Sequence, residues 1–270
     1  MTAKGGDFLL GAGNISAVNN ITLNASGKAD LTNATLNSSS GAVSVTAQGG
    51  DFLLGAGNIS AVNDITLNAS GKADLTNATL NSSSGAVSVT AQGGDFLLGA
   101  GNISAVNNIT LNASGKADLT NATLNSSSGA VSVTAQGGDF LLGAGNISAV
   151  NDITLNASGK ADLTNGTLNS SSGAVSVMAQ GGDFLLGAGN ISAVNDITLN
   201  ASGKADLNGG TLNSSEGNIS VSAVSTTSAD GISLSDNGNI SAANGTVTLQ
   251  GSSATGAGVR VSNAAIYAQK

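Results

Sequence analysis

Two aspartates recur along the chain at fixed places, represented by Asp30 and Asp51, and each returns every 44 residues. Paired carboxylates are the groups with which glycoside hydrolases cleave sugar chains. Such catalysis needs the two carboxylates in unlike surroundings, so that only one of them holds a proton. Every copy here has nearly the same neighbours, with Lys28 and its copies in alternate coils. We therefore expect no enzyme activity, and a polysaccharide-acting enzyme is kept as the second alternative function.

The second of these aspartates lies in the phrase GGDFLLGAG, residues 49–57, which is similar to a glycine-rich calcium-binding nonapeptide. In this phrase Asp51 follows the two glycines directly and the middle glycine is missing, so each turn supplies one carboxylate where a calcium cage needs several oxygen ligands. The pattern favours a turn whose aspartate accepts backbone hydrogen bonds. We expect no metal and no cofactor.

The composition removes several other chemistries. The chain has no Cys, His, Trp or Pro, which excludes disulfides, thiolate and imidazole ligands, and histidine-based nucleophile activation. Its formal net charge of -8 would repel a phosphate backbone, so no nucleic-acid partner is expected. No stretch is apolar enough to span a bilayer, so no membrane insertion is expected either.

Hydroxyl and amide side chains form a second candidate site. They alternate with apolar residues, so that all of them should face outward as a two-column ladder. Ice-binding β-helices order water on such ladders, which makes an ice- or surface-binding protein the first alternative function. Hydrogen bonding between coils explains the ladder more simply. The ladder residues are Thr22, Asn24, Ser44, Thr46, Thr66, Asn68, Ser88 and Thr90.

The elements that would hold these side chains follow from the repeat. Five units of 44 residues fill positions 5–224, and each divides into two halves of 22 residues. Within a half, apolar and polar residues alternate as in a strand, and Gly, Ser and Asn follow at short intervals. These features predict an all-β, right-handed parallel β-helix of about 12 coils, because parallel crossovers are almost always right-handed.

The inward columns should carry the core. We expect Asp30 to match Asp51 between neighbouring coils, which turns Phe52 and Leu54 inward and Leu53 outward. The opposite facing would expose five phenylalanines as an apolar stripe. The core columns expected from this pattern include Ile21, Leu23, Val43, Val45, Phe52, Ile65, Leu67 and Phe96.

The two ends of the chain differ from its middle. The repeats occupy residues 1–224, and Met1 stands inside a strand, so we expect a truncated N-terminal end with a bare sheet edge that allows end-to-end self-association. Residues 225–270 are degenerate coils that either cap the stack or continue it. Only this irregular region, from about residue 224 onward, could supply a cleft made of unlike loops.

The first unit also contains five sequences of the form Asn-x-Ser/Thr, which are acceptors for N-linked sugars. A chain this rich in Asn, Ser and Thr produces such triplets by chance, so glycosylation is only a secondary hypothesis. The asparagines are Asn14, Asn20, Asn24, Asn33 and Asn37.

The phrases GNISAVNDITLNASGKADLTNATLNSSSG and GAVSVTAQGGDFLLGAGNISA resemble the repeats of filamentous-haemagglutinin-like exoproteins, over about residues 5–224. That group contains bacterial adhesins and contact-dependent inhibition proteins of the two-partner secretion route. The resemblance implies a secreted or cell-surface structural shaft that projects a distal domain. It also implies an outer-membrane secretion partner for the parent protein, and contact with a host or bacterial surface through glycans or matrix.

Overall fold

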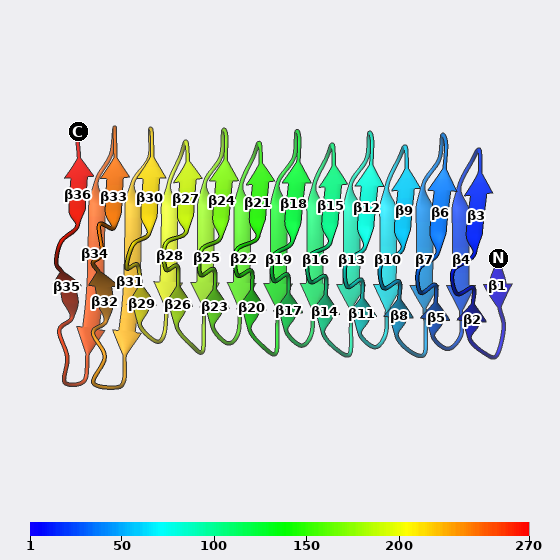
Figure 1. Cartoon of the computed structure of the whole chain (residues 1–270), viewed down its shortest axis with the longest axis horizontal. Helices are drawn as coiled ribbons and strands as arrows, with labels where there is room; N and C mark the ends of the chain where they lie inside the picture. The colour runs from blue at the N-terminus through cyan, green and yellow to red at the C-terminus, as the bar shows by residue number, and fades with distance from the viewer. Residues whose placement is uncertain (270) are drawn as a thin grey trace. The chain divides into compact units, whose positions relative to one another are not determined.

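A computed structural model describes residues 1–269, and over this range the chain is a parallel β-solenoid of about 12 coils of about 22 residues. This confirms the predicted all-β coil architecture, while the right-handed sense stays a prediction. The chain divides into two compact units, Met1–Gly137 and one that begins at Gly138. Each coil contributes one strand to each of three parallel sheets (Figure 1).

The strands of the first unit fall into three sets by their order within a coil. The first sheet contains β1 (Thr2–Ala3), β4 (Ile21–Ala25), β7 (Val43–Ala47), β10 (Ile65–Ala69), β13 (Val87–Ala91), β16 (Ile109–Ala113) and β19 (Val131–Ala135). The second contains β2 (Phe8–Leu9), β5 (Ala29–Asp30), β8 (Phe52–Leu53), β11 (Ala73–Asp74), β14 (Phe96–Leu97) and β17 (Ala117–Asp118). The third contains β3 (Asn14–Ala17), β6 (Thr35–Ser38), β9 (Asn58–Ala61), β12 (Thr79–Ser82), β15 (Asn102–Ala105) and β18 (Thr123–Ser126).

The second unit repeats this order. Its first-sheet strands are β22 (Ile153–Ala157), β25 (Val175–Ala179), β28 (Ile197–Ala201), β31 (Ile219–Ser225) and β34 (Val247–Ser253). Its second-sheet strands are β20 (Phe140–Leu141), β23 (Ala161–Asp162), β26 (Phe184–Leu185), β29 (Ala205–Asp206), β32 (Ile232–Leu234) and β35 (Val259–Val261). Its third-sheet strands are β21 (Asn146–Ala149), β24 (Thr167–Ser170), β27 (Asn190–Ala193), β30 (Thr211–Ser214), β33 (Asn239–Ala242) and β36 (Ala265–Ala268).

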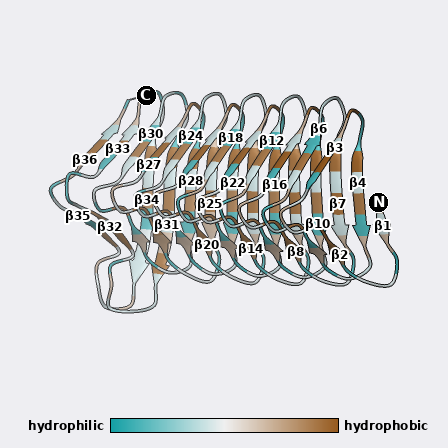
Figure 2. Ribbon diagram, turned by 45° about the vertical axis from the view of Figure 1, so that its right-hand side comes forward, coloured by the Kyte–Doolittle hydropathy of each residue, from teal (hydrophilic) through white to brown (hydrophobic). Residues whose placement is uncertain are grey.

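The core lies inside the coils, where alternate strand residues point. Hydrophobic segments recur at the same place in successive coils of each unit (Figure 2). The residues of the expected core columns are all buried, and Ile21 is the most exposed of them at 4%. Phe52 and Leu54 are fully buried, whereas Leu53 is only half-buried, so the phenylalanine faces inward. The core residues are Ile21, Leu23, Val43, Val45, Phe52, Ile65, Leu67 and Phe96.

The expected pairing of Asp30 with Asp51 is wrong. Asp30 pairs with Leu53, and Ala29 pairs with Phe52. The reason is a difference in turn length, because the first turn has three residues in one coil (26–28) and four in the next (48–51). The last turn compensates, with four residues (39–42) and then three (62–64), so both coils keep 22 residues.

Buried serines in the third sheet replace the alanines of alternate coils. Ser82, the register partner of Ala61 and Ala105, is 1% exposed. Its hydroxyl donates to the Asn63 carbonyl at 2.7 Å and accepts the Gly85 N–H at 3.0 Å. Each such serine therefore ties the turn of its own coil to the coil before it, and its buried hydroxyl is itself paired.

The last coil of the second unit continues the apolar columns. Val259, Val261 and Ile266 pair in register with Ile232, Leu234 and Ile240, which are fully buried. The three later residues are 37%, 46% and 44% exposed. No helix among residues 1–269 is long and apolar enough to cross a membrane.

Candidate functional site

The outward ladder lies on the first sheet of each unit. In the first unit, Thr22, Ser44, Thr66 and Ser88 are successive register partners, and they form one column. Asn24, Thr46, Asn68 and Thr90 form the second column in the same way. Because alternate residues of these strands are buried, the ladder side chains project from the opposite face of the sheet.

The ladder side chains do not hydrogen-bond to one another, which overturns the expected explanation by bonds between coils. Among the described residues, none of the eight side chains bonds to another protein group. Their donors and acceptors are therefore free to meet solvent or a ligand.

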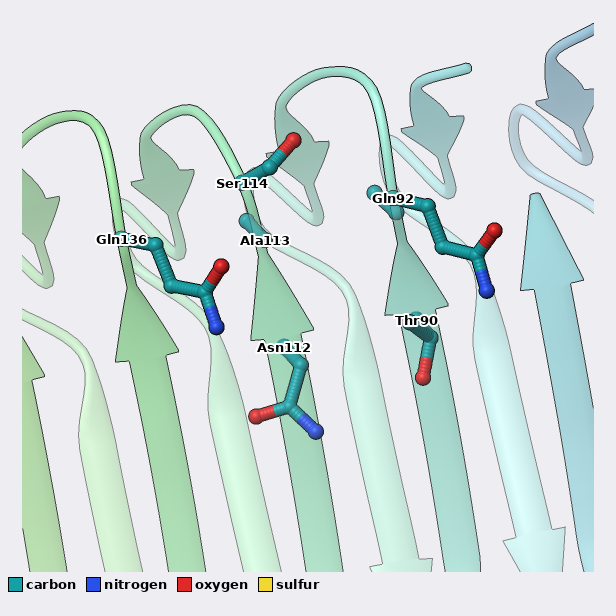
Figure 3. A pocket seen from close by; sticks show the side chains of 7 residues that line it. Thr90, Gln92, Asn112, Ala113, Ser114 and Gln136 are labelled. Carbon is teal, nitrogen blue, oxygen red and sulfur yellow. The ribbon is translucent and has the colours of Figure 1, made fainter. Parts of the chain in front are cut away.

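Two shallow hollows lie on the ladder of the first unit, two coils apart. One hollow of about 200 Å³ is lined by Thr90, Gln92, Asn112, Ser114 and Gln136, together with two alanines. Figure 3 shows the amides of Gln92 and Gln136 on either side of Asn112 and Ser114. A second hollow of about 190 Å³ has the same residue types one repeat earlier: Thr46, Gln48, Asn68, Ser70 and Gln92, again with two alanines. Both hollows are uncharged.

Met178 changes this ladder in the second unit. It occupies the place that Thr90 has in β13, and it pairs with Asn156 in β22. The Oδ1 atom of Asn156 is buried without a hydrogen-bond partner, the only such side-chain atom in the part of the chain that the structure describes. A longer apolar side chain at this position thus accompanies burial of one oxygen of the neighbouring amide.

The aspartate of GGDFLLGAG acts on the backbone of the next coil. Asp51 Oδ1 accepts the Lys72 N–H at 2.9 Å. A Cβ atom at Gly71 would lie 2.2 Å from that oxygen, which explains the glycine. This is the turn interpretation expected from the sequence. Among residues 1–269, no three acidic, His or Cys side chains form a group that could hold a metal ion.

The other recurrent aspartate is held within its own coil. The Thr32 hydroxyl donates to Asp30 Oδ1 at 2.7 Å, the Thr32 N–H donates to it at 3.2 Å, and Lys28 Nζ lies 3.5 Å from Oδ2. The Thr32 hydroxyl is the largest of the causes that lower the pKa of Asp30. At Asp74, burial raises the pKa, but the hydrogen bonds from Thr76 and the nearby Lys72 outweigh it and hold the pKa below its usual value.

The same contacts recur at Asp118 and Asp162. There too burial raises the pKa of the carboxyl, and a threonine and a lysine lower it below its usual value. At Asp30, Asp74, Asp118 and Asp162, the same kinds of neighbour, a threonine and a lysine, lower the pKa of the carboxyl. Paired-carboxylate catalysis needs two carboxyls in unlike surroundings, and these four have closely similar ones.

The asparagines of the glycosylation triplets all lie outside the core. Asn14, Asn20, Asn33 and Asn37 are exposed, and Asn24 is half-buried. Asn20 has a structural role, because its Oδ1 accepts the Ala42 N–H at 2.9 Å. Asp64 makes the same bond to Ala86 at 2.8 Å, which explains why Asn and Asp interchange at this place.

Two loops of the irregular region differ from the turns of the regular repeats. They are residues 226–231 and 254–258 of the second unit. They follow the lengthened strands β31 and β34 and reach beyond the neighbouring turns of that unit (Figure 1). Asp230 and Arg260 form an ion pair between the two coils, and Asp230 also accepts the Ala257 N–H at 2.8 Å. The side-chain bond from Arg260 lowers the pKa of Asp230. Sequence reasoning missed this pair, although the single arginine marks the region.

A hollow of about 140 Å³ lies beside the first of these loops. It is lined by Asp183, Gly203, Lys204, Ser225, Thr226, Thr227 and Ala229. Asp183 is its one carboxylate, and that side chain already accepts the Lys204 N–H at 2.9 Å. The hollow therefore lacks the second carboxylate that glycoside hydrolysis requires.

No protein-family model, curated protein or solved structure matches this chain. The likeness to filamentous-haemagglutinin-like repeats rests on the repeat residues, and membership of that group stays a prediction.

Proposed function

We propose that the chain is a shaft segment of a secreted or cell-surface bacterial exoprotein of the adhesin type, where it holds a distal domain away from the cell. Its coils are interchangeable spacers, and the parent protein leaves the cell through an outer-membrane secretion partner. Catalysis is no part of this role.

The observation that carries the proposal is the recurrence of identical contacts in successive repeats. The Asp-to-backbone bond of the first turn measures 2.9 Å at Lys72, 2.8 Å at Lys116, 2.8 Å at Lys160 and 2.9 Å at Lys204. An enzyme needs a few unlike groups brought together once, whereas a stack of equal coils suits length and surface. The β-solenoid fold is compatible with this use.

Labelling of intact cells tests the proposed location. Antibodies against the 44-residue repeat should stain unbroken bacteria that produce the parent protein, and external protease should remove the signal. A cytoplasmic protein of known abundance serves as the control for lysis. Staining that appears only after the cells are broken would contradict the proposal.

A second candidate, an ice- or surface-binding protein, is favoured by one observation. The ladder hydroxyls and amides make no hydrogen bond to other protein groups in the described part of the chain. An ice recrystallisation assay on the purified chain tests the ice-binding form of this candidate.

A further inference from the structure

We propose that the first-sheet ladder of the first unit binds an extended, uncharged β-1,4-linked polysaccharide, which lies across the strands and places alternate sugars at the two hollows. The inference rests on the proposed function, because a surface shaft would meet such polymers, and it names their chemical class.

The hollow chemistry matches a polyol. The Thr90 hydroxyl and the Gln92 and Asn112 amides can each donate and accept hydrogen bonds, as sugar hydroxyls do. None of these three side chains is bonded to the rest of the described chain. A sugar would therefore displace only solvent, and no internal bond would be lost. The hollow of about 200 Å³ is smaller than a pocket for a whole drug-sized ligand, which suits one ring of a longer polymer.

The spacing of the hollows suggests a polymer with a two-residue period. Equivalent lining residues such as Thr46 and Thr90 lie two coils apart in register, through β10. Two strand spacings amount to roughly 9.6 Å. In an extended β-1,4-linked chain, alternate sugars present the same face, and two successive sugars span a closely similar length. One polymer can thus make the same contacts at both hollows.

Other occupants fit the surface less well. No lysine or arginine lines either hollow, so nothing there would attract a phosphate backbone or a sulfated glycan. Aromatic and large aliphatic anchors, which dominate binding at protein interfaces, are also absent from both linings. The hollows break the flat surface that an ice lattice would need.

Because no aromatic ring lines either hollow, none can stack on a sugar there, and a single hollow should bind a sugar weakly. Useful affinity must then come from one polysaccharide molecule that occupies two hollows at once. After its first sugar is bound, binding of the second becomes an intramolecular step. The inference therefore predicts a steep dependence on the length of the oligosaccharide.

The test uses the purified chain with cello- and chito-oligosaccharides of increasing length, measured by calorimetry, and hydroxyethylcellulose in affinity gels. We expect at least about a tenfold fall in Kd once an oligosaccharide is long enough to span two hollows. The double variant Thr46→Met, Thr90→Met should abolish this gain. It is expected to fold, because the chain itself carries Met178 at the equivalent register position.

Asn81→Ala with Asn125→Ala is the matched control, since both asparagines are exposed on the third sheet and line neither hollow. It should leave Kd within about twofold of the parent value. Binding by neither oligosaccharide series, a Kd independent of length, or equal loss in the control would overturn the inference. Ice recrystallisation inhibition without sugar binding would do the same. The binding assay uses purified protein, so a failure to bind sugar would refute this inference alone. Failed labelling of intact cells would refute the proposed surface location.

Discussion

Phe96 in β14 pairs in register with Ala117 in β17 and with Ala73 in β11, so each buried ring lies between two methyl groups. Large and small side chains alternate along this column in the first unit, so no ring is the register neighbour of another ring. Alternate coils therefore differ in a way that matters for core packing as well as for the lengths of their turns.

Truncation of this ring should be costly. We expect Phe96→Ala to lower the free energy of unfolding by about 3–5 kcal/mol, because neither neighbouring alanine can fill the cavity. Phe8→Ala removes the same side chain where it is only half-buried, so its loss should be clearly smaller. Urea unfolding followed by circular dichroism measures both, and equal losses would contradict the packing account.

Adjacent serines provide a sharper comparison. Ser82→Ala should cost about 1–3 kcal/mol, because it leaves the buried Gly85 N–H without its acceptor. Ser83→Ala, at an exposed neighbour, should change stability by less than about 0.5 kcal/mol. If both variants unfold at the same urea concentration, the serine does not tie the coils together.

The position of Asp64 should tolerate asparagine but not alanine. Asn20 already makes the same bond elsewhere in the first unit, so Asp64→Asn should be neutral within about 0.5 kcal/mol. Asp64→Ala should cost about 1 kcal/mol, since Ala86 N–H loses its partner at an exposed site. Thermal unfolding of the two variants in parallel measures the difference. A destabilised Asn variant would show that charge, and not the acceptor oxygen, matters.

Acid should weaken the fold through the aspartates held by threonine. The pKa of Asp74 and of Asp118 is lower in the folded chain than the ordinary value, so the unfolded chain binds more protons in acid. Their contribution to the free energy of unfolding is complete above the unfolded pKa of about 3.9. It is lost as the pH falls through the lower pKa values of the folded chain.

Urea midpoints between neutral pH and pH 3 measure this loss. Thr76→Val with Thr120→Val removes one donor from each carboxylate, which raises both pKa values. The double variant should be less stable at neutral pH and should lose less stability in acid. If the urea midpoint of the double variant fell with pH as steeply as that of the parent chain, these two aspartates would be excluded as the source of the acid sensitivity.

Much of the architecture could be predicted from the sequence, because strand alternation and a 22-residue period leave few other folds. The inward facing of Phe52 followed from the size of its side chain. The register between Asp30 and Leu53 did not, because the one-residue change in the first turn is cancelled in the last turn and leaves the period unchanged. Among candidate sites, the ladder was visible as a pattern. The hollows beside Gln92 were not, since they depend on how far neighbouring side chains extend.

If the coils are interchangeable, the chain should still fold after deletion of residues 93–136. The new junction of Gln92 with Gly137 reproduces the native Gln136–Gly137 junction, so every inward column should stay in register. Deletion of residues 93–103 alone is the control, because it places inward strand residues over turn residues. The measurement is the equilibrium unfolding curve. We expect a cooperative unfolding transition of the β-sheet for the 44-residue deletion and loss of that transition for the shorter one. A 44-residue deletion that fails to fold would contradict this interchangeability, because one repeat would then hold something that the other four do not.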